Sequence, residues 1–426
     1  MHTTADLFQI LFAPFFTLVK DLPLRKKDRG PLSWYFVITL LVLLAYGLVI
    51  LFSASYSMSY QESGDSFGQI RQQLIFAVIG LAIMFVVSLC DYRALRHATI
   101  YVYLLSLVLL VAALFSNNPT NLQAKCYRWV DIFGVTFQPS ELAKFAVILG
   151  TAAYVDAYRQ KIKGLIYGII LPSLPLIPIL LLILQQPHYS AIILILLIYV
   201  TMLVCAGCGL RWMPMFLAIG AAGVVFFLTS QQNYVQTRLD GWQLFSYDTS
   251  TMTDQTRQSV YAIASGGLFG LGIGNGRQKH QWLAEVANDF IFPVICEELG
   301  FIGAVVCMVL FAALIIQGIL IAMRAPDLFG SILGVGIMGQ IAWQVFCNVG
   351  VVTNTIPNTG ISLPFFSSGG TSLLMLLGEM GVMLSISRVG NARIEERRRR
   401  KREEFAKKLD GGRRTTYRRR ESARTI

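Results

Sequence analysis

Three acidic residues stand at the entrance to an apolar run of the chain, and they are the first candidates for chemistry. Asp289 precedes the run, and Glu297 and Glu298 lie within it. Acidic side chains inside or at the edge of a membrane cost free energy, and they usually serve a function. The residues before Asp289 are polar and rich in glycine. We therefore expect the chain to hold the stretch 257–303 against a substrate that the membrane carries.

A second pair of ionisable residues lies in the sequence FQPSELAKFAVI, residues 137–148. Pro139 suits the first turn of a helix. Glu141 and Lys144 are three residues apart, so they share one face of that helix and can pair. One interpretation is a self-neutralising pair that tolerates burial. The other is that Lys144 faces a cavity and binds a phosphate group as a point charge.

An arginine and a tryptophan lie side by side in a predicted outer loop, at Arg128 and Trp129. Together they could clamp a pyrophosphate or a sugar. They could equally form a plain interfacial anchor, because tryptophan is common at membrane surfaces. The pattern leaves both interpretations open.

Six glycines interrupt the polar stretch before Asp289 without forming a nucleotide-binding motif. Their spacing fits neither GxGxxG nor a P-loop. Glycine allows a turn to bring its backbone close to another group. The pattern therefore favours a compact turn whose backbone approaches a substrate. These glycines are Gly266, Gly267, Gly270, Gly272, Gly274 and Gly276.

Residues 355–374 have the composition of an outer loop that re-enters the membrane. Prolines and glycines interrupt the segment, and Phe365 and Phe366 are apolar enough to enter the bilayer. Irregular backbone at membrane depth is tolerated only where it lines a cavity or is buried in protein. The segment therefore predicts a groove beside Asp289.

The composition is that of a membrane protein. Hydrophobic residues make up 55% of the 426 residues and charged residues 14%, and the mean hydropathy is +0.58. Soluble chains carry roughly 25% charged residues. Repeated apolar runs of about 20 residues match the thickness of a bilayer. We therefore expect an all-α polytopic membrane protein with about ten transmembrane helices. The expected spans are residues 34–53, 69–89, 98–116, 139–157, 165–184, 189–207, 213–230, 290–323, 328–350 and 371–387. The eighth is too long for one simple crossing, and we expect Pro293 and Gly300 to interrupt its outer part.

Lysine and arginine predict the orientation of these spans. Most of the 36 fall in segments that lie inside if the N-terminus is inside, as the positive-inside rule requires. Both termini are therefore expected in the cytoplasm, with a large outer loop, residues 231–289, between spans seven and eight. The predicted organisation is an N-terminal arm over 1–33 that contains an interfacial anchor, a membrane domain over 34–387, and a basic tail over 388–426.

The basic tail holds sixteen of the 36 lysines and arginines. Next to a final span, such a run marks the cytoplasmic side and meets anionic lipid headgroups. We therefore expect anionic membrane lipid as a partner of the tail, and no nucleic acid.

Four sequence blocks together resemble the SEDS family, the FtsW/RodA/SpoVE group. The blocks recur in order across nearly all of the expected spans, so the resemblance covers most of the chain. The GxGNGRQK form resembles the FtsW and SpoVE branch more than RodA. The blocks are FQPSELAK, QSVYAIASGGLFGLGIGNGRQK, NDFIFPVICEELGFIG and NTGISLPFFSSGG.

The resemblance implies a peptidoglycan glycosyltransferase that polymerises lipid II on the outer face of the cytoplasmic membrane. It further implies a role in cell division at the septum, beside a class B penicillin-binding protein that crosslinks the product, and other division proteins. The family's proposed catalytic acid falls on Asp289. A carboxylate there could take the proton of an attacking sugar hydroxyl. Glu297 and Glu298 lie two turns deeper, and we expect them to support the helix.

Further residues are expected to bind the substrate, among them cations that stabilise the departing pyrophosphate. No cluster of metal ligands shows in the sequence, so no metal site is assigned. A divalent cation, Mg²⁺ or Mn²⁺, held partly by Asp289 stays an alternative. The expected substrate-binding residues are Arg128, Trp129, Glu141, Lys144, Gln258, Ser259, Arg277, Lys279 and Ser367.

The sequence departs from the family pattern at a few positions. His188 stands where the family has an acid, which argues against a carboxylate role there. Ala284 replaces a proline shortly before Asp289, and Ser368 replaces a tyrosine in the last outer loop. None of these departures alters Asp289.

Two other functions stay open. A transporter (flippase) of lipid-linked precursors would account for the Glu141–Lys144 pair and the interrupted spans, although no internal repeat is evident. A noncatalytic scaffold for division proteins would use the basic tail as its docking element.

Overall fold

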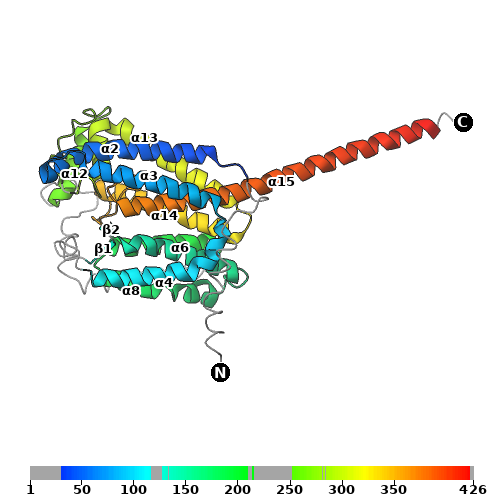
Figure 1. Cartoon of the computed structure of the whole chain (residues 1–426), viewed down its shortest axis with the longest axis horizontal. Coiled ribbons are helices and arrows are strands. Elements are labelled where there is room, and N and C mark those ends of the chain that lie inside the picture. Colours follow the sequence, from blue (N-terminus) through cyan, green and yellow to red (C-terminus); the bar gives the residue numbers. More distant parts are fainter. Residues whose placement is uncertain are drawn as a thin grey trace, which may run out of the picture.

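Long helices lying side by side make up most of the described chain (Figure 1). The computed structural model describes residues 30–116, 127–132, 134–209, 214, 252–280, 282–283 and 285–422. The helices are α2 (Trp34–Ser63), α3 (Gly68–Leu89), α4 (Leu95–Leu114), α6 (Pro139–Tyr158), α8 (Leu176–Gln185), α9 (Tyr189–Cys205), α12 (Asp254–Ser265), α13 (Ile291–Met323), α14 (Leu328–Val352) and α15 (Gly370–Ser422). Shorter elements are η2 (Tyr92–Ala94), β1 (Val130–Ile132), β2 (Val135–Phe137), η3 (Ile166–Ile170) and α7 (Leu171–Ser173).

The expected all-α membrane class is confirmed. Seven helices among the described residues are long and apolar enough to cross a membrane, and α9 is a shorter apolar helix. Nine of the ten expected spans coincide with helices. The seventh, residues 213–230, lies outside the described residues except for Pro214. The number of ten spans therefore stays a prediction.

Close packing between neighbouring helices depends on small residues. α15 packs along α3, while α13 packs against both α2 and α14. A Cβ atom on Gly381 of α15 would lie 2.7 Å from the backbone oxygen of Met84 on α3. Small residues allow membrane helices to approach in this way, where lipid removes most of the hydrophobic drive for helix association.

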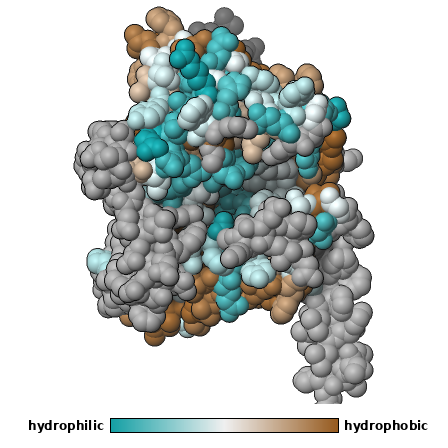
Figure 2. Space-filling model, turned by 90° about the vertical axis from the view of Figure 1, so that its left-hand side faces the viewer, coloured by the Kyte–Doolittle hydropathy of each residue, from teal (hydrophilic) through white to brown (hydrophobic). Residues whose placement is uncertain are grey.

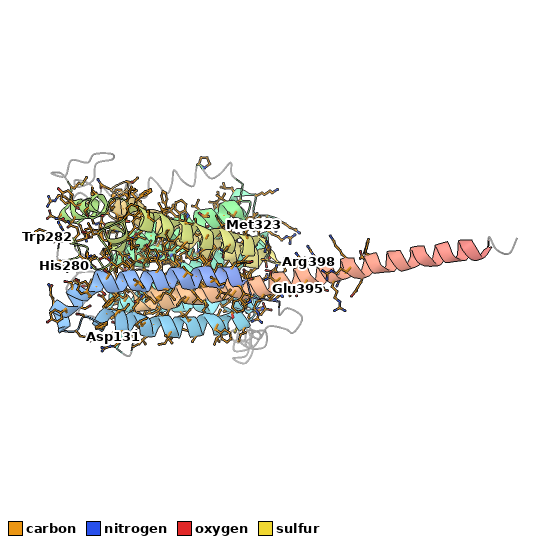
Figure 3. The ribbon with its side chains drawn as sticks, turned by 90° about the horizontal axis from the view of Figure 1, so that it is seen from above. Asp131, His280, Trp282, Met323, Glu395 and Arg398 are labelled. Carbon is orange, nitrogen blue, oxygen red and sulfur yellow. The ribbon has the colours of Figure 1, made fainter. Side chains whose placement is uncertain are left out.

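The described parts of the loops expected outside lie together at one end of the bundle. Figure 3 shows Asp131, His280 and Trp282 at this end, and Met323 and Glu395 toward the other. We call the first of these the outer end. Which side of a membrane it faces stays a prediction from the distribution of lysine and arginine.

A short β-hairpin at the outer end was not expected from the sequence. β1 pairs with β2 in antiparallel register, with Val130 opposite Phe137. Gly134 has a φ of 80° in the turn, and its amide donates to Asp131 Oδ1 at 2.8 Å. The hairpin leads directly into α6, whose first residue is Pro139, as expected.

α13 is broken in its outer part, as expected, but at one residue rather than two. Gly300 has φ 68° and ψ −167°, a non-helical conformation inside the helix. Pro293 does not interrupt α13, because it lies in the first turn, where its missing amide hydrogen is not needed. The prediction of a break at Pro293 was therefore wrong.

The final span and the tail form one continuous helix, α15, which the sequence analysis had divided at Ser387. The helix runs out of the bundle and away from it (Figure 1). At the point of exit, Asn391 Nδ2 donates to Pro31 O at 2.8 Å, and Arg393 donates to Pro326 O at 2.6 Å. The expected interfacial anchor in the N-terminal arm lies outside the described residues.

Candidate functional site

Asp289 lies at the outer end, just before the first residue of α13, and its backbone is firmly held. The fully buried side chain of Asn348 on α14 donates through Nδ2 to the carbonyl of Asp289 at 2.8 Å. The same nitrogen donates to the carbonyl of Ile361 at 2.7 Å. Asn348 therefore joins three segments that are far apart in the sequence, and it leaves the half-buried Asp289 side chain at the rim.

The loop after α14 lies against the residues before Asp289, where a groove was expected. Ser367 Oγ donates to Asn288 O at 2.5 Å and accepts the amide hydrogen of Leu363 at 2.8 Å. The amide of Ser368 donates to Ala287 O at 2.7 Å. The loop thus positions Asp289, and Ser367 holds backbone groups as part of it.

Gly360 brings this loop directly onto the carboxylate. Its φ is 68°, and a Cβ atom at this position would lie 3.0 Å from Asp289 Oδ2. The same loop lines a small cavity together with Gln344 and Leu376. Figure 2 shows hydrophilic side chains gathered over this end of the molecule, around a hollow. The position of the loop beside Asp289 agrees with the expectation.

A stripe of polar side chains that was not expected from the sequence runs along α14 from Asp289 into the bundle. Gln340, Gln344 and Asn348 are spaced four residues apart, so they share one helix face. All three are buried, and each has a side-chain oxygen without a hydrogen-bond partner among the described residues. Buried polar atoms of this kind are normally satisfied by water or by a ligand. We call these three residues the α14 stripe.

Three ionisable side chains meet at the inner end of the α14 stripe. Lys144 Nζ pairs with Glu141 Oε1 at 2.8 Å, and both side chains are buried. Glu379 on α15 accepts from Gln340 Nε2 at 3.0 Å, and it lies close enough to both to interact with their charges. Lys144 thus pairs with Glu141, and Glu379 lies near this ion pair inside the bundle. Glu379 was not singled out from the sequence.

The pairing of Lys144 fits the interpretation of a self-neutralising pair, but only in part. Glu141 Oε2 is buried and has no hydrogen-bond partner among the described residues. The pair also lies beside the α14 stripe rather than against apolar side chains alone. A role of Lys144 and Glu141 in substrate binding therefore stays a prediction.

His188, which stands where the family pattern has an acid, lies near two cations. The side chain is buried at the start of α9. Burial, together with the positive charges of Arg128 and Lys144, lowers the pKa of His188 well below its usual value. The imidazole is therefore neutral at pH 7. Arg128 itself donates to Pro187 O at 2.5 Å, and Trp129 is half-buried.

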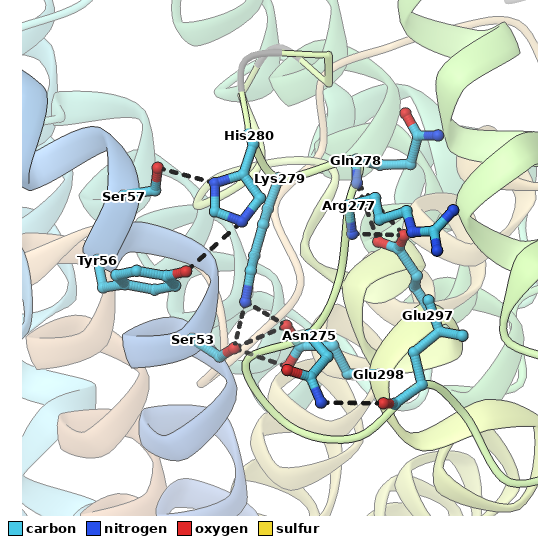
Figure 4. Close-up of polar contacts among 11 residues, drawn as sticks. Ser53, Tyr56, Ser57, Asn275, Arg277, Gln278, Lys279, His280, Glu297 and Glu298 are labelled. Atoms are coloured by element: carbon cyan, nitrogen blue, oxygen red, sulfur yellow. Dashed lines mark hydrogen bonds and ion pairs between the residues drawn. The ribbon is translucent and has the colours of Figure 1, made fainter.

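Lys279, expected to bind substrate, is committed to a buried ion pair (Figure 4). Its ammonium group lies 2.6 Å from Glu298 Oε1, and both side chains are fully buried. Ser53 on α2 donates to Glu298 at 2.6 Å and accepts from Lys279 at 3.0 Å. The ammonium group also lies 4.8 Å from the centre of the Tyr56 ring. We call Ser53, Lys279 and Glu298 the buried triad. Substrate binding by Lys279 stays a prediction.

Glu297 was expected to support the helix, and its side chain instead holds the loop before Asp289. Its Oε1 atom accepts the amide hydrogen of Arg277 at 2.8 Å and that of Gln278 at 3.3 Å. The side chain of Arg277 is exposed at the outer end, so it is available to an anion there.

The two candidates on α12 differ in their surroundings. Ser259 is fully buried and donates to Val352 O at 2.7 Å, which joins α12 to the end of α14. Gln258 is half-buried. The helix α12 covers the helix-like pattern QTRQSVYAIA. Substrate binding by either residue stays a prediction.

The described residues give no support to a metal site at Asp289. Among them, no group of three or more histidine, cysteine, aspartate or glutamate side chains is placed to hold a metal ion. A divalent cation, Mg²⁺ or Mn²⁺, held partly by Asp289 stays a prediction.

We expect replacement of Asn348 by leucine to destabilise the site. The change leaves the buried carbonyls of Asp289 and Ile361 without their donor, at a cost of roughly 2–5 kcal/mol in total. The unfolding temperature of the purified variant measures this. Phe346→Leu is the matched control, because Phe346 lies on the same helix with 64% of its surface exposed. Equal unfolding temperatures for the two variants would contradict the role of Asn348 in holding these two carbonyls.

Comparison with known proteins agrees with the resemblance of the sequence blocks. The family model for FtsW, RodA and SpoVE, described as "Cell cycle protein", matches residues 33–392. Stage V sporulation protein E of Bacillus subtilis (strain 168) is 36% identical over 361 residues, which are 83% of this chain and 96% of that protein. A protein named "Probable peptidoglycan glycosyltransferase FtsW" of the same organism is 34% identical over 377 residues, 85% of this chain and 92% of that protein.

Solved structures share the fold. A chain of a peptidoglycan synthase complex superposes with a TM-score of 0.67 and 24% identity, over 84% of this chain and 98% of that one. The crystal structure of rod shape determining protein RodA of Thermus thermophilus gives a TM-score of 0.62 and 24% identity, over 84% and 97%. The fold therefore extends over the same region as the sequence match. This chain belongs to the FtsW/RodA/SpoVE family of cell cycle proteins.

Proposed function

We propose that this chain is a peptidoglycan glycosyltransferase that polymerises lipid II into glycan strands on the outer face of the cytoplasmic membrane. The observation that carries the proposal is the family match over residues 33–392, which includes relatives named as peptidoglycan glycosyltransferases that align with 85% of the chain. The geometry supports it, because a carboxylate at the rim of a membrane bundle suits a substrate with a lipid tail and a polar head.

Asp289 is the proposed general base. In the reaction, a hydroxyl oxygen of one lipid-linked sugar forms a bond to the anomeric carbon of another. The bond from that carbon to the lipid pyrophosphate breaks, and the pyrophosphate leaves with the bonding electrons. The Asp289 carboxylate takes the hydroxyl proton, which requires hydrogen-bond reach and a fixed position. The hydrogen bond from Asn348 to the Asp289 carbonyl supplies that fixed position, together with the bond from Ser367 to the Asn288 carbonyl.

Cations near Asp289 are proposed to stabilise the departing pyrophosphate. Arg277 is one candidate, because its side chain is exposed at the outer end. Lys144 and Lys279 each pair with a buried glutamate. Their contribution to binding would therefore require the ion pair to rearrange.

A class B penicillin-binding protein is the proposed partner, with the septum as the proposed place of action. Support comes from a structural neighbour that is part of a peptidoglycan synthase complex and from relatives named FtsW. Other division proteins, and anionic lipid at the basic tail, are proposed as further partners.

Replacement of Asp289 by asparagine should reduce polymerisation by at least about 100-fold, since a general base contributes roughly 10²–10⁴-fold. The measurement is glycan formation from purified lipid II, with and without a class B partner. Asp65→Asn is the matched control. Asp65 lies in the loop between α2 and α3 and forms a partly exposed ion pair with Arg71, so the change removes one negative charge at the surface. The activity of this variant should match that of the unaltered protein. Unaltered activity in a folded Asp289→Asn variant would disprove the role of Asp289.

A flippase is the second candidate, and the α14 stripe is the observation that favours it. Polar and ionisable groups inside a bundle mark pathways in transporters. The same preparation distinguishes the two functions. Translocation of labelled lipid II into vesicles without polymer formation would favour the flippase over the polymerase.

A further inference from the structure

The glycine-rich segment before Asp289 exchanges backbone hydrogen bonds with the broken part of α13. The break at Gly300 frees helical donors and acceptors on both sides of it. Four hydrogen bonds satisfy them. They run from Phe301 N to Gly267 O at 2.9 Å, from Ile302 N to Leu268 O at 3.2 Å, from Leu271 N to Glu297 O at 2.9 Å, and from Gly272 N to Glu298 O at 2.9 Å.

These bonds define the path of the segment. It leaves α12 beside Cys296, where a Cβ atom on Gly266 would lie 1.8 Å from the carbonyl oxygen. It then inserts at the break, between the amides of Phe301 and Ile302 on one side and the carbonyls of Glu297 and Glu298 on the other. In an unbroken helix these amides would bond to these carbonyls, so the segment fills the gap that the break opens and turns back within it. We call residues 266–272 the glycine hairpin.

The tip of the glycine hairpin is apolar and exposed. Leu268 and Phe269 expose 63% and 80% of their surfaces. The carbonyl of Leu268 accepts a hydrogen bond from the amide of Ile302, which follows Phe301 in the chain. The tip therefore lies beside Phe301, which exposes 63% of its surface. No charged residue occurs between Gly266 and Gly276. An apolar tip next to an apolar helix face is a poor surface to present to water.

The same exposed face continues down α13 toward the other end of the bundle. Its exposed side chains are Phe301, Ile302, Val305, Val306 and Val309. α13 is one of the helices long and apolar enough to cross a membrane, so this face meets acyl chains. The tip extends that face without a polar gap.

We propose that the tip of the glycine hairpin, Leu268 and Phe269, inserts into the bilayer leaflet at the outer end and contacts acyl chains. Irregular backbone is tolerated at membrane depth only where its polar groups are satisfied, and the four hydrogen bonds to α13 supply this. Gly270 permits the turn, because its φ of 78° favours glycine and a Cβ atom there would lie 2.2 Å from Glu298 O. The segment is thus a re-entrant membrane element rather than part of an aqueous loop.

The position of the tip can be measured with nitroxide labels, independently of any activity. Single cysteines replace Leu268 or Phe269 in a chain whose seven native cysteines are changed to alanine or serine. The protein is reconstituted in phosphatidylcholine–phosphatidylglycerol vesicles. Collision with oxygen, which concentrates in lipid, is compared with collision with a water-soluble nickel chelate. Val309→Cys is the lipid control, since Val309 is 59% exposed on α13, and Asp254→Cys is the aqueous control, since its side chain is 86% exposed.

Labels at positions 268 and 269 should favour oxygen over the nickel chelate several-fold more than the label at position 254. They should resemble the label at position 309. A preference equal to that at position 254 would show an aqueous loop and overturn the proposal. Low collision rates with both reagents would show that protein covers the tip, which overturns it as well. Circular dichroism of each labelled protein, compared with the cysteine-free parent, establishes that the fold is retained.

Discussion

Replacement of Lys279 by methionine is expected to destabilise the protein by about 3–5 kcal/mol, the usual cost of removing one partner of a buried ion pair. The ammonium group and the Glu298 carboxylate are both fully buried. Without Lys279, the one partner left to the Glu298 side chain among the described residues is the Ser53 hydroxyl. The unfolding temperature of the purified protein measures the loss.

Two further variants make this experiment specific. Lys279→Met combined with Glu298→Gln removes both charges and should recover part of the lost stability. Arg399→Met removes a cation whose side chain is 81% exposed and pairs with Glu403, and it should change stability by no more than about 1 kcal/mol. If Lys279→Met unfolds at the same temperature as Arg399→Met yet loses polymerisation, Lys279 binds substrate as the sequence suggested, and the buried triad is wrong.

Replacement of Gly300 by alanine is expected to cost about 2–5 kcal/mol, from backbone strain and from overpacking. The φ of 68° and ψ of −167° suit glycine alone. A Cβ atom would lie 2.4 Å from Gly270 N and 2.5 Å from Leu268 O, so the glycine hairpin would have to leave α13. The unfolding temperature and the nitroxide collision rates at position 269 should both change.

The same substitution at two other glycines separates the causes. Gly267 has a φ of 55° but nothing within 4 Å of a Cβ atom, so Gly267→Ala should show strain alone. Gly150 lies inside α6 with open space around it, so Gly150→Ala should be neutral or stabilising by up to about 1 kcal/mol. If Gly300→Ala behaves like Gly150→Ala, the break in α13 is not required.

The class of fold could be predicted from the sequence because the bilayer imposes a length and a composition on every helix that crosses it. The break at Gly300 could be predicted for a similar reason, since glycine inside a long apolar run weakens the helix there. The hairpin of β1 and β2 could not, because three-residue strands leave no periodic signal. The continuity of α15 was missed because the change from apolar to basic residues near Ser387 marks the membrane surface, which need not end a helix.

The candidate site was predicted where motifs mark it and missed where only spacing does. Asp289 and the Ser367 loop came from recognisable blocks, and they lie together. Gln340, Gln344 and Asn348 could have been found from polar residues four apart in an apolar span. Glu379 is a lone acid in the final span and carried the same signal. The roles of Lys279 and Glu298 could not be predicted, because a partner on α2 completes the buried triad from far away in the sequence.

The unbroken course of α15 has a mechanical consequence. One helix carries Glu379 inside the bundle and the basic tail outside it. A torque applied to the basic tail would turn Glu379 away from Gln340, because a helix is stiff about its own axis. The contacts of Asn391 with Pro31 and of Arg393 with Pro326 resist this rotation where the basic tail leaves the bundle. The basic tail and the charged side chains inside the bundle therefore rotate together.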